Sequence, residues 1–207
     1  MRTSLSPSWC LCRRTEAAAR ERTERGLTGV SEHRGQSELE QGLSELLEHD
    51  FSQPALLRLA LTHSSLGYEE QMAREAESSA TTAKDNEQLE FIGDAVLGLI
   101  VAETLYRRYP HLREGDLTRL RASLVSRKHL AERAAELRLG DYLRLGKGEE
   151  TTGGRKKPAL LSDAMEAVVA ALYLDGGMGA ATKFVLARIV EPALPALAEA
   201  MGGGGAI

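Results

Sequence analysis

The sequence predicts an all-α fold. Two long segments, residues 86–105 and 159–174, are largely apolar and place their few acidic residues at helical spacing. Shorter segments before and after them repeat apolar residues at intervals of three and four, which is typical of helices with one buried face. No segment alternates cleanly between apolar and polar residues, as a half-exposed strand would.

Length and composition narrow the class of protein. The 207 residues, 43% of them hydrophobic, suffice for one ordinary domain with a packed core, or for one domain with a small module. No apolar run approaches the ~18 residues of a membrane span, so we expect no membrane partner. A net charge of −4 is not that of a basic nucleic-acid-binding domain. Cys10 and Cys12 fit neither a zinc site nor a disulfide framework, so we expect a cytoplasmic protein.

The N-terminal part is expected to hold an arm and two helices. Residues 1–36 are polar and lack apolar periodicity, which indicates a disordered arm; a mis-called start codon would explain them equally well. Pro54 suits the first turn of the second helix. His63 either binds RNA or metal, or is a hydrogen-bonded structural histidine, and we expect the structural role. Residues 69–85 are polar and predict an exposed, partly helical loop. The first amphipathic helix is marked by Leu39, Leu43, Leu46 and Leu47.

Residues 86–97 form the segment around which the rest is organised. Glu87, Glu90 and Asp94 stand at i, i+3 and i+7, so at ~100° per residue they share an arc of roughly 60° on one helical face. The remaining positions are mostly apolar, which is typical of a buried helix. Because buried carboxylates need cations or hydrogen bonds to compensate them, this face indicates a metal site. The alternative is an acidic helix edge that faces water. This helix alone does not decide between that edge and a metal site.

The same segment carries signals about its ends and its packing. Asp85 or Asn86 can cap the helix, which must stop before Pro110. Gly93 lies in the middle, where glycine costs roughly 1 kcal/mol relative to alanine. A close approach by another backbone, either a packed helix or a dimer partner, would explain it. Phe91 is either a dimer contact or an ordinary core residue.

Residues 159–174 predict a second buried helix with an acidic face. Only Asp163 and Glu166 are charged, and their i, i+3 spacing places them on one side. Two such helices can satisfy their acidic faces by meeting across a shared cation. Mg²⁺ is the natural candidate, because carboxylate oxygens suit it and no Cys/His cluster competes.

Two further segments are basic. Residues 115–127 and 128–139 predict two helices, with Asp116 as a candidate cap for the first; residues 146–158 combine four glycines with cations. In each segment the cations contact phosphate, or they belong to a solvated helix face or a plain loop. The cations of the helices are Arg119, Arg121, Arg127, Lys128 and Arg133, and those of the Gly-rich segment are Lys147, Arg155, Lys156 and Lys157.

The C-terminal part is expected to bend and then end in a tail. Gly176 and Gly177 break the second acidic helix, residues 178–189 predict another helix, and residues 199–207 predict a flexible Gly-rich tail.

Four blocks, in the same order along the chain, resemble the ribonuclease III catalytic domain. They run from about residue 39 to residue 192. The blocks are residues 61–64 (LTHS), 86–97 (NEQLEFIGDAVL), 115–125 (GDLTRLRASLV) and 153–177, which includes GGRKK, DAMEA and YLDGG. The resemblance assigns residues 37–198 to that domain, of bacterial type.

The resemblance implies a function and roles for the acids. Glu90, Asp163 and Glu166 would ligate Mg²⁺, with Mn²⁺ as a substitute. Asp94 and Glu166 would be the catalytic carboxylates, and Glu87 would line the site. The family implies a homodimer that cleaves double-stranded RNA to 5′-phosphate products, in the processing of rRNA, mRNA and tRNA precursors.

The C-terminus departs from the bacterial pattern. Bacterial members usually carry a double-stranded-RNA-binding domain after the catalytic one. This sequence ends in a glycine tail, so we expect that domain to be missing, either through truncation or in a natural short form. We therefore expect weak, salt-sensitive RNA binding. Two alternatives remain open: a non-catalytic RNA-binding or ribosome-associated protein of the same fold, and a plain helical dimerisation module.

Overall fold

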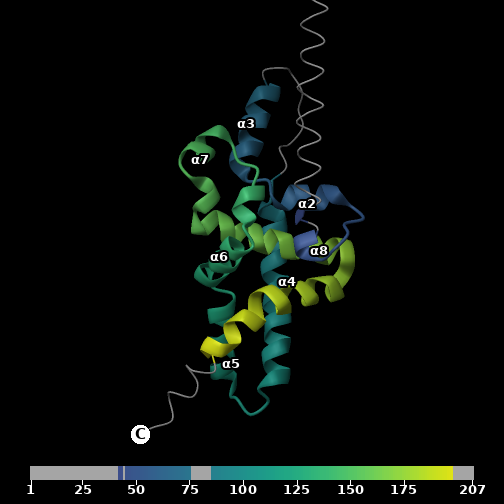
Figure 1. Ribbon diagram of the computed structural model, residues 1–207, viewed down its shortest axis with the longest axis vertical. Helices are drawn as coiled ribbons and strands as arrows, with labels where there is room; N and C mark the ends of the chain where they lie inside the picture. Colours follow the sequence, from purple (N-terminus) through teal and green to yellow (C-terminus); the bar gives the residue numbers. More distant parts are fainter. Residues whose placement is uncertain (1–41, 44, 76–84, 198–207) are drawn as a thin grey trace, which may run out of the picture. The chain divides into compact units, whose positions relative to one another are not determined.

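The described part of the protein is helical (Figure 1). The computed structural model describes residues 42–43, 45–75 and 85–197. Within these ranges the only β-type pairing is an isolated bridge between Thr62 and Arg144, so the all-α prediction is confirmed. The predicted arm at residues 1–36, Leu39 and the tail at residues 199–207 lie outside the described residues.

The described residues include seven α-helices and four shorter helical turns. None of the described helices is long and apolar enough to cross a membrane. The α-helices are α2 (Pro54–Ala60), α3 (Ser64–Glu75), α4 (Glu87–Arg108), α5 (Glu114–Leu124), α6 (Arg127–Glu136), α7 (Lys147–Thr151) and α8 (Pro158–Val185). Shorter helical turns are η1 (Leu139–Tyr142), η2 (Gly154–Lys156), the π-type η3 (Leu186–Val190) and η4 (Glu191–Ala193).

Helices α4 and α8 cross at the centre of the fold (Figure 1). The first half of α8 is buried almost all round, including Met165 and Val168, because its sequence is apolar on nearly every side. The backbones touch at Gly93. A Cβ atom there would lie 1.9 Å from the carbonyl oxygen of Glu166, so only glycine permits this crossing. A packed helix, rather than a dimer partner, accounts for the glycine.

Several predicted helix ends are confirmed. Asn86 is the N-cap position of α4 but makes no side-chain capping bond; one residue earlier, the Oδ1 of Asp85 accepts a hydrogen bond from the Glu87 N–H at 3.1 Å. The amide of Asn86 instead donates to the Ala60 carbonyl at 3.3 Å. Pro54 opens α2, and α4 ends at Arg108 before Pro110. Gly177 has φ 72°, which bends α8 where a break was predicted.

One local prediction is wrong. Asp116 does not cap α5, because the helix already begins at Glu114 and the Asp116 carboxylate pairs with Arg119 one turn later. Residues 69–85 were predicted to be a partly helical loop; α3 continues as far as Glu75, in agreement with the helical part, and residues 76–84 lie outside the described residues.

The Gly-rich segment at residues 146–158 is also not a plain loop, since it folds into α7 and η2. Arg155 donates to the carbonyls of Gly140 and Leu143, both at 2.9 Å, and Lys157 pairs with Glu149 at 2.6 Å. Two of its four cations therefore hold the segment to itself and its neighbours, which sequence spacing alone does not reveal.

Candidate metal centre

The crossing of α4 and α8 brings the predicted acidic faces together. Glu87, Glu90, Phe91 and Asp94 from α4 and Glu166 from α8 line one hollow of about 530 Å³. We call it the crossing hollow. Glu87 and Asp94 are exposed, whereas Glu90 and Glu166 are half-buried. Acids that are 72 to 79 positions apart in sequence thus share one site, because Gly93 lets α4 lie directly on the backbone of Glu166.

Asp163 completes the group from one turn earlier in α8. It does not line the crossing hollow, but it is close enough to raise the pKa of both Glu90 and Glu166 by charge repulsion. Its own pKa is raised, chiefly by burial. The structure therefore places all five predicted acids in one neighbourhood.

The electrostatics of this group are unfavourable to ionised carboxylates. Burial first, and then the charges of Asp94, Glu90 and Asp163, raise the pKa of Glu166 to about 7. Burial, and then Asp163 and Glu87, raise the pKa of Glu90. Binding of a proton or a cation would therefore stabilise this group of acids.

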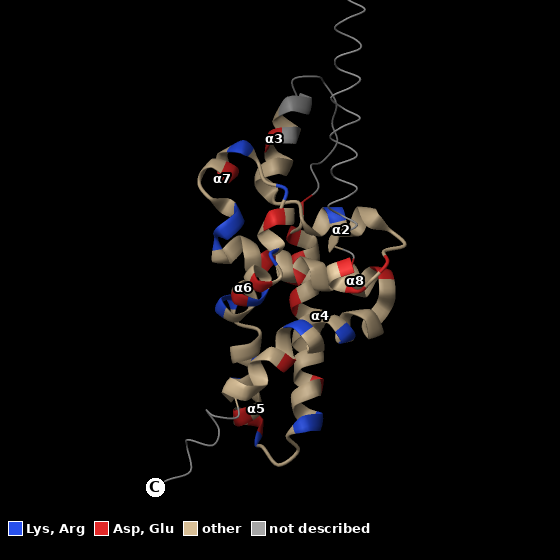
Figure 2. Ribbon diagram, viewed as in Figure 1, with Lys and Arg blue, Asp and Glu red and all other residues tan. Residues whose placement is uncertain are grey.

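Cationic side chains do not neutralise the group. Arg127, the first residue of α6, lowers the pKa of Glu90, Asp163 and Glu166, yet less than burial raises each. Within the described residues none of the five acids forms an ion pair with an Arg, Lys or His side chain. Figure 2 shows acidic segments where α4 and α8 cross, and basic segments on α6 and α7.

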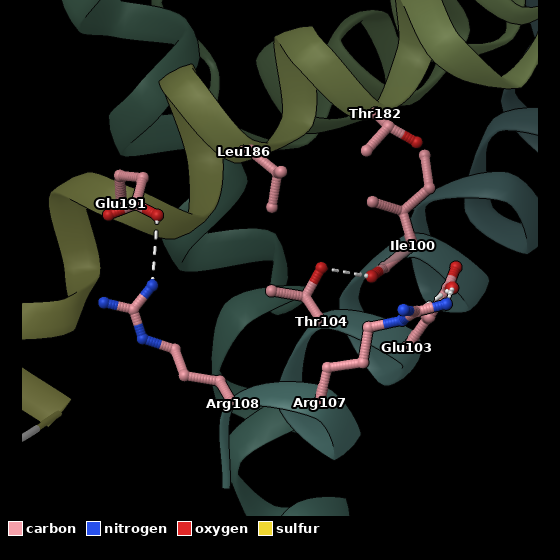
Figure 3. Close-up of a pocket in the computed structure, with 8 residues that line it drawn as sticks. All are labelled: Ile100, Glu103, Thr104, Arg107, Arg108, Thr182, Leu186 and Glu191. Carbon is pink, nitrogen blue, oxygen red and sulfur yellow. Dashed lines mark hydrogen bonds and ion pairs between the residues drawn. The ribbon is translucent and has the colours of Figure 1, made fainter.

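A second hollow at the other end of α4 is built differently (Figure 3). We call it the arginine hollow; its volume is about 390 Å³. Glu103 pairs with Arg107 at 2.6 Å, and Glu191 pairs with Arg108 at 3.1 Å, so each acid has its own cation. Its lining residues are Ile100, Glu103, Thr104, Arg107, Arg108, Thr182, Leu186 and Glu191.

The donor set of the crossing hollow fits a hard divalent cation. Only carboxylate oxygens line it among polar side chains, and these are the ligands that Mg²⁺ and Mn²⁺ take. No three described His, Cys, Asp or Glu side chains are grouped tightly enough to hold an ion as they stand. Like charges repel, so carboxylates that share a hollow stay apart until a proton or cation joins them.

Two residues near the acids were not recognised from the sequence as parts of the site. Arg127 was counted among the cations of a basic region, and His63 was expected to be structural. Both are close enough to Asp163 to lower its pKa. No local spacing signals this, because His63 and Asp163 are 100 positions apart in the sequence and come near each other only through the fold.

Phe91 lies at the rim of the crossing hollow and is 81% exposed, so its interpretation as a core residue is wrong. Leu99 and Tyr106 follow at intervals of eight and seven residues, which keeps them on a similar side of α4, and they are 56% and 70% exposed. This side of α4 is an apolar stripe with no cover among the described residues.

Comparison with known proteins identifies the family. The Ribonuclease-III-like family model matches residues 53–193. The chain belongs to the ribonuclease-III-like family. Ribonuclease 3 of Solibacter usitatus is 52% identical over 153 residues, which are 73% of this chain and 55% of that protein. Ribonuclease 3 of Oleidesulfovibrio alaskensis is 51% identical over 144 residues, 70% of this chain and 59% of that protein.

A solved structure agrees with this assignment. The nuclease domain of ribonuclease III from Campylobacter jejuni matches with a TM-score of 0.63 and 39% identity, over 74% of this chain and 96% of that one. The ribonuclease-III-like chain thus corresponds to that nuclease domain. It spans a little over half of the length of the two Ribonuclease 3 relatives above.

Proposed function

We propose that this chain is a Mg²⁺-dependent endoribonuclease that cleaves double-stranded RNA to 5′-phosphate products. The single observation that carries the proposal is the group of five carboxylates at the crossing of α4 and α8, which no described cation pairs with. Buried acids without cations destabilise a fold, so such a group is expected where a metal is to be bound. The relatives named Ribonuclease 3 support the reaction class.

The acids divide into ligands and catalytic carboxylates. Glu90, Asp163 and Glu166 would hold Mg²⁺, or Mn²⁺ in its place. A bound divalent ion supplies a water of lowered pKa and neutralises charge that develops on the phosphate. Asp94 is exposed, as is Glu87. It would act together with Glu166 on the attacking water. Glu87 would line the entrance.

The RNA would be recognised mainly by the shape of its A-form helix and by its 2′-hydroxyl groups. Exposed cations lie in two places after α5: Arg127 and Lys128 open α6, while Lys147 and Lys156 lie in the Gly-rich segment. These would contact phosphates. We place the reaction in the processing of rRNA, mRNA and tRNA precursors in the cytoplasm.

We also propose a homodimer in which the apolar stripe of α4 is covered. Phe91, Leu99 and Tyr106 expose large apolar surfaces on one helix, and contiguous exposed apolar surface marks interaction sites. The Campylobacter jejuni structure is described as having flexibility in a region involved in dimer formation of its nuclease domain. Two protomers would bring two crossing hollows to one duplex, one for each strand.

Cleavage of a long RNA duplex tests the proposal. The unmodified chain should cut the duplex with Mg²⁺ and not with EDTA, and Glu166→Gln should abolish cutting while leaving the fold intact. Glu103→Gln is the matched control, because Glu103 lies on the same helix but is already paired with Arg107. Unchanged cutting by Glu166→Gln would refute the proposal. Duplex binding without cutting at any Mg²⁺ concentration would favour the non-catalytic alternative.

A further inference from the structure

The start of helix α2 is tied to α8 by one carboxylate. Asp175 of α8 accepts hydrogen bonds from the Ser52 N–H at 3.0 Å and from the Ser52 Oγ at 2.7 Å. It also accepts from the Gln53 N–H at 2.8 Å and from the His49 Nε2 at 2.8 Å. The Asp175 side chain is only 2% exposed, so water competes little for these bonds. The tie lies on the straight part of α8, two residues before the bend at Gly177.

The other end of α2 is tied to the start of α4. Asn86, the residue just before α4, is 4% exposed. Its side-chain amide donates to the carbonyl of Ala60, the last residue of α2, at 3.3 Å, and its backbone N–H donates to the Thr62 carbonyl at 2.9 Å. The Asn86 carbonyl accepts from the Glu90 N–H at 2.8 Å, so the first turn of α4 continues directly from this tie.

These two ties and the backbone contact at Gly93 connect three helices in a closed triangle (Figure 1). Helix α8 runs nine residues from Glu166 to Asp175, α4 runs seven residues from Asn86 to Gly93, and the seven residues of α2 join the two far ends. At 1.5 Å per residue the three sides are roughly 14, 10 and 10 Å long. We call these segments the helix triangle. A single contact point leaves the angle between two crossing helices unfixed, whereas a closed triangle fixes it.

The helix triangle contains the acids of the crossing hollow. Glu87 and Glu90 lie on the side formed by α4, and Glu166 lies at the corner where α4 and α8 touch. The angle between α4 and α8 therefore sets how far the acids of one helix stand from the acid of the other. Groups that bind one ion together must be held within about 0.5 Å of the productive geometry, so this angle matters for binding.

We infer that Asn86 and Asp175 are positioning residues for the crossing hollow: by holding α2 between α4 and α8, they set the angle at which Glu90 faces Glu166. The inference rests on the proposed metal-dependent function. Neither Asn86 nor Asp175 lines the crossing hollow, so each acts on the acids through the helices that it joins. Because both hold the same helix, losing either one opens the same triangle.

Amide hydrogen exchange without metal tests the link between the two ties. Asp175→Asn keeps the shape of the side chain but replaces one accepting oxygen with an N–H₂ group. It should speed exchange of the Glu90 N–H by at least about threefold, although the hydrogen bonds described above join Asp175 to residues 49–53 and not to α4. The Tyr109 N–H, which bonds the Leu105 carbonyl at 2.9 Å at the other end of α4, should exchange as before. No change at Glu90, or an equal change at Tyr109, would overturn the inference.

Binding of Mn²⁺ without RNA, followed by electron paramagnetic resonance on folded variants, tests the effect on the site. Asn86→Ser and Asp175→Asn should each weaken Mn²⁺ binding by about tenfold, the low end of the effect of losing a group that orients metal ligands. Serine suits a helix start, but its shorter side chain does not reach the Ala60 carbonyl. Thr104→Val is the matched control, because it removes a 2.7 Å hydrogen bond to the Ile100 carbonyl further along α4. That variant should bind Mn²⁺ normally.

The double variant shows whether the two residues act through one triangle. Independent losses would multiply to about 100-fold, since effects at separate sites add as free energies. Losses through one triangle should leave the double variant close to the weaker single variant. A multiplied loss would overturn the inference.

The outcomes separate this inference from the proposed function. If the unmodified chain binds Mn²⁺ and cuts duplex RNA while both single variants bind Mn²⁺ equally well, the inference alone is overturned. If the unmodified chain neither binds Mn²⁺ nor cuts, the proposed function fails and takes the inference with it. If either single variant does not fold, Ser52→Ala decides: it removes only the 2.7 Å hydroxyl bond to Asp175, and should still weaken Mn²⁺ binding and speed exchange at Glu90. Unchanged values in that variant would overturn the inference.

Discussion

Helix α4 has acidic residues near both of its ends. At one end these acids have cationic partners, and at the other end they have none. In the arginine hollow, Glu103 and its helix partner Arg107 form a pair, and Glu191 pairs with Arg108 (Figure 3). At the crossing hollow, three acids of α4 lie near Glu166 and Asp163 of α8, and Arg127 lowers the pKa of Glu166 without forming an ion pair.

The difference lies in what each arrangement does to the folded state. Exposed pairs such as Arg108–Glu191 are screened by water and contribute about 0–1 kcal/mol. Unpaired, partly buried acids instead oppose folding, as the raised pKa values of Glu90, Asp163 and Glu166 express. Unpaired acids on two helices at the crossing hollow cost stability, which indicates that they serve a function. The ion pairs of the arginine hollow indicate ordinary surface structure.

The largest effect should come from removing charge at the crossing hollow. Glu90→Gln and Asp94→Asn should each reduce cleavage of duplex RNA by on the order of 10²–10³-fold or more, the size typical for loss of a group that stabilises a transition state. Single-turnover cleavage rates measure this. Glu191→Gln, which removes an acid from the arginine hollow that is exposed like Asp94, should change the rate less than about threefold. Equal losses of cleavage rate in the variants of the two hollows would contradict the proposed difference between them.

The packing of the crossing should be the next most sensitive feature. Gly93→Ala should lower the free energy of unfolding by about 3 kcal/mol, because its new Cβ would meet the Glu166 carbonyl at 1.9 Å and drive α4 off α8. Urea unfolding measures this. Gly98→Ala, one and a half turns further along α4, meets nothing within 4 Å and should be neutral or raise stability by up to about 1 kcal/mol. A stable Gly93→Ala variant would show that the helices do not cross as described.

Stability without metal should depend on pH through Glu166. Its pKa rises from 4.5 to about 7 on folding, so between these values the folded protein holds a proton that the unfolded chain has lost. Stability therefore falls as pH rises from 4.5 to 7. Glu166→Gln should remove much of this slope and raise stability at pH 8 by about 1–3 kcal/mol, allowing for partial solvation. Thermal unfolding in EDTA at pH 5, 6, 7 and 8 measures it; an unaltered slope in the variant would contradict this account.

The smallest effect should come from the paired end itself. Arg108→Met should lower the free energy of unfolding by less than about 1 kcal/mol, because the Arg108–Glu191 pair is exposed on both sides. Unfolding at low and at high salt checks this, since added salt should shrink the difference further. A loss above 2 kcal/mol would mean that this hollow supports the fold more than its exposure indicates.

Local spacing predicted much of this molecule. The i, i+3, i+7 acids of residues 87–94, the i, i+3 pair at 163 and 166 and the bend at 177 all depend on neighbours within a turn or two, so the sequence could reveal them. That the two acidic helices meet followed from the cost of leaving buried carboxylates without a cation, and the family resemblance then implied a role for each acid.

What the sequence did not reveal depends on contacts between distant residues. Arg155 was expected to contact phosphate or lie in a plain loop, yet its guanidinium binds carbonyls of residues 140–143. Phe91 is exposed because no described residue packs on its side of α4. In a helix that is apolar on most sides, periodicity does not show which side stays uncovered. The roles of the five acids in metal binding remain predictions.

Thermal unfolding at pH 8 with increasing Mg²⁺ tests most directly whether the crossing hollow takes a divalent cation. For the unmodified chain we predict a midpoint that rises with Mg²⁺, as required when a ligand binds only the folded state, and almost no rise for a Glu90→Gln, Glu166→Gln double variant. An equal rise in both proteins, or none in the unmodified chain, would contradict the central claim.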